Sequence, residues 1–229
     1  MRTLTHWITP HQFTGDIFDT IALVKARTPA RWQPAVLVPA VYGAIWQASG
    51  ELYNRLHMDL RPGNGPDLRW IVDRFEEAGI KCGAWGVPRE LGAAEGAAHG
   101  EAASQVSLYV LDLEPYPYFL TQNDRDPDAF IANYVARAMI RPWISVVPQP
   151  SGIDPLRSAW RKWLWWAAGV RPQCYGATYP QLAWPAPSRA FLRAAMRRVR
   201  ISRPVVPMLD SRSDLPRARS DRDLWHLGV

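Results

Sequence analysis

Apolar and polar residues follow two patterns along this chain, one with the period of a helix and one typical of strands. The clearest helical periodicity runs from Pro66 to Ala78, where apolar residues recur at i, i+3, i+4 and i+7, namely Leu68, Ile71, Val72 and Phe75. Pro66 suits the first turn of a helix and Gly79 suits its C-terminal cap. The pattern predicts an amphipathic helix that is followed directly by a strand.

Short apolar runs that end in proline or turn residues predict strands. These runs occupy residues 4–9, 35–42, 80–87, 107–115, 143–147, 171–175, 204–210 and 223–229. Helical patterns fall between most of them, at residues 16–26, 66–78, 91–103, 126–140, from 154 onward, and 188–199. Strands that alternate with helices favour parallel pairing in one sheet.

The predicted fold is therefore α/β, a (β/α)8 TIM-like barrel. Its helices are reduced near the C-terminus, because only residues 211–222 separate the last two predicted strands. A single barrel domain over residues 1–229 is expected, since 229 residues with 48% hydrophobic content can bury one full core. A doubly wound open sheet is the alternative, but no Gly-rich phosphate loop follows the first predicted strand.

The strand within Ser107–Pro115 carries the most distinctive chemistry. Side chains alternate between the two faces of a strand, so Asp112 and Glu114 share a face with Val110. Acids at the carboxyl end of a buried parallel strand match the place where active sites lie in α/β barrels. A solvated strand end or a salt-bridged pair is the structural alternative for these two acids.

In a barrel, the carboxyl ends of the strands meet around one mouth. The residues expected there are Trp7, Tyr42, Trp85, Asp112, Glu114, Gln149, Gln173, Tyr175, Asp210 and Trp225. Acids surrounded by aromatic rings suggest a carbohydrate, because aromatic faces pack on sugar rings while amides and carboxylates bind hydroxyl groups. Glu114 is the expected general acid/base, Asp112 its electrostatic partner and Asp210 a second acid from another strand, although Asp210 could instead cap a turn.

A family resemblance rests on Val110–Glu114. This segment resembles the Asp-x-Glu signature of glycoside hydrolase barrels of the chitinase-like family 18 and lysozyme-like family 25 types. The resemblance implies that Glu114 is the catalytic acid, that Asp112 orients the substrate, that Tyr175 assists and that Trp225 forms the floor of the sugar site. Trp7, Tyr42, Trp85 and Gln173 are the further substrate-binding residues expected around it.

Two hypotheses follow from this resemblance. The first is a glycoside hydrolase that cleaves a cell-wall or other amino-sugar polysaccharide, as a phage lysin does. The second is a catalytically inactive barrel that binds glycan or serves as a structural module, for example in a phage virion. No cofactor is expected, and the five histidines show no metal-ligand spacing.

Charge and one tryptophan bear on partners and location. The net charge is +6, with many arginines between 189 and 203, which most simply form a solvated helix face, so nucleic acid is not the expected partner. Trp165 lies on the basic face of its predicted helix, which suggests a contact with a protein partner or a second copy. With no apolar run of membrane-spanning length and no secretory signal, no membrane contact is expected, and the protein is expected to be cytoplasmic, virion-associated or released.

Overall fold

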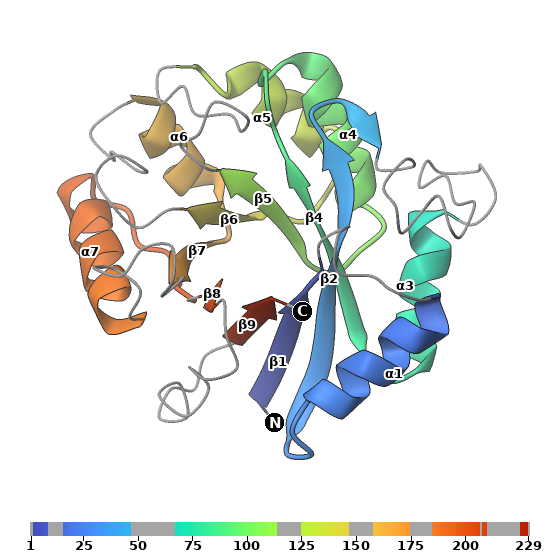
Figure 1. The fold of residues 1–229 in the computed structure, drawn as a ribbon. Coiled ribbons are helices and arrows are strands. Elements are labelled where there is room, and N and C mark those ends of the chain that lie inside the picture. Colours follow the sequence, from blue (N-terminus) through green and yellow to red (C-terminus); the bar gives the residue numbers. More distant parts are fainter. Residues whose placement is uncertain are drawn as a thin grey trace.

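In the computed structural model, the strands form one curled sheet and the helices lie along its outer side (Figure 1). The structure describes residues 2–8, 16–46, 67–113, 125–146, 158–174, 185–206, 208–209 and 225–228. Among them, no helix is long and apolar enough to cross a membrane.

The sheet is almost entirely parallel. Its strands are β1 (Arg2–Trp7), β2 (Trp32–Tyr42), β3 (Ile45–Trp46), β4 (Lys81–Val87), β5 (Tyr109–Leu113), β6 (Trp143–Val146), β7 (Gly169–Cys174), β8 (Met208–Leu209) and β9 (Trp225–Gly228). They are ordered β1-β9-β8-β7-β6-β5-β4-β2-β3, and β1 also pairs with β2. Among the described strands, only the hairpin strand β3 is antiparallel to its neighbour.

This architecture confirms the predicted α/β class with a curled parallel sheet, consistent with a TIM-like barrel. The complete (β/α)8 form is not reached in the described part of the chain. β8 contributes two residues, so β7 and β9 each meet it over a two-residue register. The predicted reduction of the last helices falls on residues outside the described ranges, and the single domain over residues 1–229 stays a prediction.

Most helices begin and end within about four residues of where the apolar patterns place them, but the helix predicted over residues 126–140 ends at Val135. The helices are α1 (Ile17–Arg27), α3 (Leu68–Glu77), α4 (Ala93–Ala103), α5 (Asp128–Val135), α6 (Ser158–Trp166) and α7 (Pro185–Arg198). Asp16 caps α1 by accepting hydrogen bonds from the backbone N–H groups of Phe18 and Asp19. The predicted apolar stripe of α3 is buried, and Gly79 ends the helix with a φ of 76°.

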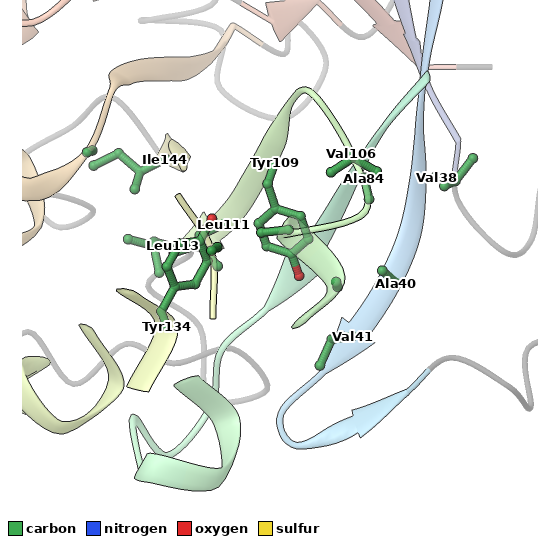
Figure 2. Packing of buried hydrophobic residues seen from close by; sticks show 14 of the residues in the cluster. Val38, Ala40, Val41, Ala84, Val106, Tyr109, Leu111, Leu113, Tyr134 and Ile144 are labelled. Carbon is green, nitrogen blue, oxygen red and sulfur yellow. The ribbon is translucent and has the colours of Figure 1, made fainter. Parts of the chain in front are cut away.

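The main core lies between the sheet and the helices. Figure 2 shows Tyr109, Leu111 and Leu113 of β5 on this side, together with Tyr134 of α5. All four side chains are buried, and full burial of a side chain of this size stabilises the fold by about 1.5–3 kcal/mol. The period-two alternation read from the sequence is therefore confirmed on the helix-facing side.

The opposite face of the sheet lines the interior of the curl. A second, smaller apolar cluster lies there, with Trp7, Leu37, Val110 and Met208 buried and Trp85 and Trp143 partly buried. These side chains come from β1, β2, β5, β8, β4 and β6, so strands far apart in the sequence meet at this face. The polar residues that follow on the same strands are consequently brought close together.

Candidate functional site

A row of polar side chains crosses three neighbouring strands on the interior face. In the parallel registers, Asp112 of β5 is opposite Ser145 of β6, and Ser145 is opposite Arg171 of β7. Residues paired in a parallel register point to the same side of the sheet. Gln173 lies two residues beyond Arg171 and therefore points to this side too, so the four side chains form one interior polar cluster.

Gln173 joins two members of this cluster by hydrogen bonds. Its Nε2 donates to Asp112 Oδ1 over 3.0 Å and to Ser145 Oγ over 3.1 Å. Ser145 and Gln173 are buried and Asp112 is only 7% exposed. Bonds between buried polar groups fix their geometry, because leaving such a group unbonded costs about 1–3 kcal/mol.

Arg171 is the unusual member of the cluster. Its side chain is fully buried, and none of its three guanidinium nitrogens has a hydrogen-bond partner among the described residues. Burial lowers the pKa of Arg171 to about 9. A guanidinium with a pKa in this range still carries its charge at neutral pH, so the interior holds a cation without an ion pair in the described part of the chain.

The indole of Trp143 supports the Arg171 side chain. The guanidinium carbon lies 4.8 Å from the centre of the Trp143 ring. The ring has room there because β7 begins with Gly169: a Cβ atom on Gly169 would lie 2.3 Å from Trp143 Cζ3. The indole of Trp143 therefore contacts both Gly169 and the guanidinium of Arg171.

Two of the expected aromatic residues also meet on the interior face. The rings of Trp7 and Trp85 lie 4.8 Å apart at 37°, and Trp85 Nε1 donates to the carbonyl oxygen of Ile8 over 3.0 Å. The interior face of the sheet therefore carries both an aromatic surface and the polar cluster. Tyr42, at the end of β2, lies instead beneath the Arg89 side chain, whose guanidinium carbon is 5.0 Å from the ring centre.

At the carboxyl edge of the sheet, the loop between β4 and α4 is the connection that the structure describes along its whole length. The buried carboxylate of Glu95 accepts hydrogen bonds from the backbone N–H groups of Arg89, Glu90 and Leu91 over 2.8–3.2 Å. Hydrogen bonds to an ionised group are about twice as strong as neutral ones. Glu95 therefore holds this loop in one conformation next to the carboxyl end of β4.

The structure places some of the predicted site residues together and leaves others outside the described ranges. Asp112 and Gln173 are in direct contact, and the rings of Trp7 and Trp85 pack against each other at a tilt, so these four share the interior face. Trp225 belongs to β9, and its side chain is outside the described part. Glu114, Asp210, Tyr175 and Gln149 also lie outside the described residues, so the proposed pairing of Asp112 with Glu114 stays a prediction.

Sequence reasoning missed Arg171 and Ser145. The signal for Arg171 was present, because it precedes Gln173 by two residues and must share its face in an extended strand. Ser145 could be found by the same alternation from Trp143. What the alternation does not reveal is that the charged residue at this position has no counter-ion among the described residues. No group of three or more His, Cys, Asp or Glu in the described ranges could hold a metal ion.

Comparisons with known proteins give little similarity. No family model and no curated protein matches the chain. A crystal structure of an HpcH/HpaI aldolase/citrate lyase family protein from Burkholderia cenocepacia J2315 is similar over 100% of this chain and 88% of that chain, with 10% sequence identity and a TM-score of 0.47. At that score and identity, the activity of that family is not carried over to this chain.

The expectation of a glycoside hydrolase of family 18 or 25 type is wrong. The similar structure belongs to an aldolase/citrate lyase family, and no family model supports the resemblance. The Asp-x-Glu segment misled because any buried strand with two acids in alternation satisfies it, and Asp112 is bonded to Gln173 inside the curl. The cell-wall substrate, the phage-lysin role and the inactive glycan-binding alternative rested on the same resemblance and lose their support with it.

Proposed function

We propose that this protein binds a small anionic ligand inside its curled sheet, with Arg171 as the counter-ion of a carboxylate or phosphate group. The observation that carries the proposal is the buried guanidinium of Arg171, which has no hydrogen-bond partner among the described residues. Asp112, Ser145 and Gln173 lie in the same row of the sheet and supply polar contacts for the remainder of the ligand.

The free energies of desolvation and ring stacking at Arg171 favour a bound ligand over an empty site. Removing a charged group from water costs several kcal/mol even after the protein relaxes. Stacking on Trp143 returns about 2 kcal/mol for a desolvated guanidinium, which leaves part of the cost uncompensated. An anion with two acceptor oxygens meets the planar guanidinium with two parallel hydrogen bonds and removes the deficit.

We also infer that the curled sheet closes into an eight-stranded (β/α)8 barrel around this site. The pairing of β1 with both β9 and β2 supports closure, because the strand order then returns to its starting point. A ligand in the interior would be surrounded by strands, as barrel interiors of this size hold side chains and at most one small ligand.

The proposal is tested by titrating the protein with inorganic phosphate and, separately, with malonate, in a chloride-free buffer. Binding is measured by isothermal calorimetry and by the rise in melting temperature. A ligand present at 100 times its dissociation constant is expected to stabilise the fold by about 2.7 kcal/mol. The Arg171→Met variant is expected to show neither heat of binding nor a ligand-dependent rise.

The Arg171→Met variant also separates a ligand site from a structural role. Because the substitution removes an uncompensated buried charge, the variant is expected to be more stable than the wild type in ligand-free buffer, by about 1–3 kcal/mol. Arg193→Met changes an exposed arginine of α7 and should keep the wild-type response to both anions. Loss of stability in Arg171→Met, or equal anion responses in all three proteins, contradicts the proposal.

A further inference from the structure

A groove of about 520 Å³ lies on the outer side of the molecule, between α5, α6 and the turn after α7. Figure 1 shows α6 between α5 and α7 in the outer layer. The groove is lined by two tryptophans, three aliphatic side chains, three cations and one acid, namely Trp165, Trp166, Ile131, Val199, Ile201, Arg161, Lys162, Arg200 and Asp128. It is remote from the interior polar cluster, since it lies behind the helices.

The apolar part of this groove continues beyond it. Trp165 is 65% exposed, although its neighbours Leu164 and Trp166 are buried. On α5, Val135 is 56% exposed and lies one helical turn after the groove residue Ile131, so both are on one side of the helix. An exposed apolar strip that runs out of a groove suits an extended partner better than a compact small molecule.

The charge of the groove is positive. Lys162 Nζ forms ion pairs with Asp126 Oδ2 over 2.6 Å and Asp128 Oδ2 over 2.5 Å, a local charge of −1 that the two positive charges of Arg161 and Arg200 exceed. Arg161 and Arg200 are exposed at the same groove, and neither forms an ion pair within the described part of the chain. The partner that complements them carries acidic side chains.

The backbone at Arg200 adds an independent observation. Two helices end in the same way, with a residue at positive φ after the last turn: Gly79 after α3, with φ 76°, and Arg200 after α7, with φ 57°. The next residue donates its N–H back into the helix in both cases, Ile80 to Phe75 O over 2.9 Å and Ile201 to Met196 O over 3.0 Å. Glycine adopts a positive φ without steric cost, whereas the Cβ atom of arginine makes this conformation unfavourable.

We propose that the groove between α5, α6 and the end of α7 docks an acidic segment of a partner protein that presents an apolar anchor side chain. The anchor packs on Trp165 and Ile131, and carboxylates beside it pair with Arg161 and Arg200. Tryptophan and arginine are the residues that most often dominate protein interfaces. Nucleic acid fits less well, because the apolar strip gains nothing from a phosphate backbone.

The test uses a phage-displayed library of random twelve-residue peptides selected on the immobilised wild-type protein. The expected result is enrichment of sequences in which Asp or Glu flank an aromatic or large aliphatic residue. Synthetic versions of the enriched peptides carry a fluorescent label, and their binding is followed by fluorescence anisotropy. Affinity is expected to fall at least tenfold in Trp165→Ala and in Arg200→Gly, and to weaken as salt rises.

Arg200→Gly keeps the test independent of folding. Glycine adopts the φ of 57° more readily than arginine, so this variant should melt at the wild-type temperature or above it while it loses peptide affinity. Arg193→Gln removes an exposed arginine of α7 that does not line the groove, and it should bind the peptide as the wild type does.

Four outcomes overturn the proposal. The first is a selection that enriches no peptide, or only peptides that lack acidic residues. The second is wild-type affinity of the enriched peptides for Trp165→Ala. The third is displacement of the peptide by a duplex oligonucleotide at lower concentration than the peptide itself needs. The fourth is a wild-type dimer in sedimentation that Trp165→Ala abolishes, in which case the occupant is a second copy of this chain.

Discussion

At the scale of single residues, burial decides the protonation state of His99. Its ring is fully buried in α4, where Nδ1 lies 2.8 Å from the hydroxyl oxygen of Tyr109 and the ring packs 5.3 Å from that of Phe130. Burial lowers the pKa of His99 to about 3, against a smaller opposing effect of the backbone at Gly43. His99 is therefore a neutral core residue at physiological pH.

This assignment predicts how stability changes in acid. Between pH 6.5 and about 3 the unfolded chain binds a proton at His99 that the folded chain does not, so stability falls as pH falls through this window. The expected contribution is about 1.4 kcal/mol per pH unit. In His99→Gln, urea unfolding between pH 4 and 7 should show a shallower dependence by that amount.

Tyr109→Phe is the matched control for His99. It removes the hydroxyl group that His99 contacts but leaves the imidazole buried, so it should lower stability while it keeps the wild-type pH dependence. Parallel pH profiles for the wild type and His99→Gln would show that the pKa of His99 is the same in the folded and unfolded protein, which contradicts the assignment.

At the scale of elements, α4 lies unusually close to α5 because of two glycines. A Cβ on Gly96 would lie 2.2 Å from the carbonyl oxygen of Phe130, and one on Gly100 would lie 2.6 Å from that of Tyr134. Glycine is a poor helix former, and the weak apolar pattern of residues 91–103 reflects this composition. The helix is therefore stabilised by its contact with α5 and the sheet, which the sequence pattern alone does not reveal.

The close contact predicts that Gly96→Ala destabilises the protein, although alanine is the better helix former. The backbone carbonyl of Phe130 cannot rotate away, so the helices must separate, and the expected loss is about 2–3 kcal/mol. Gly92→Ala precedes the same helix at a position where a Cβ meets nothing within 4 Å, and it should lose about 1 kcal/mol or less. Chemical denaturation of both variants checks this; equal losses would contradict the packing argument.

At the scale of the whole molecule, β9 joins β1 to β8 in the sheet. It pairs with β1 through Leu4–Trp7 and with β8 through Met208 and Leu209. Without it, β1 and β8 would each present an unpaired strand edge. The curl of the sheet, and with it the enclosure of Arg171, consequently depends on a segment at the far end of the sequence.

Leu227→Pro tests this dependence, because proline removes a backbone donor between β1 and β8. Stability is expected to fall by about 3 kcal/mol. Hydrogen exchange should show lost protection of β1 amides. Ile45→Pro, on the edge strand β3, should affect only the hairpin with β2. Unchanged protection of β1 in Leu227→Pro would mean that β9 does not hold the sheet together.

The sequence by itself determined the two faces of each strand and helix. Alternation places Tyr109, Leu111 and Leu113 toward the helices and Asp112 toward the interior, and the helical period buries Trp163 while it exposes Trp165. These assignments succeed because side-chain direction follows from backbone geometry within one element. The Asp-x-Glu resemblance failed because five residues of one strand say nothing about what surrounds them.

Only the tertiary structure decided which side chains from different strands meet. Asp112, Ser145 and Arg171 share one row because the connections and helix packing fix the register of β5, β6 and β7, and no local pattern encodes that register. The burial of the Arg171 charge without an ion pair among the described residues is likewise a property of the assembled sheet, because it depends on the strands around Arg171. The alternating pattern determines the direction of each side chain, and the packing of the whole chain determines its neighbours.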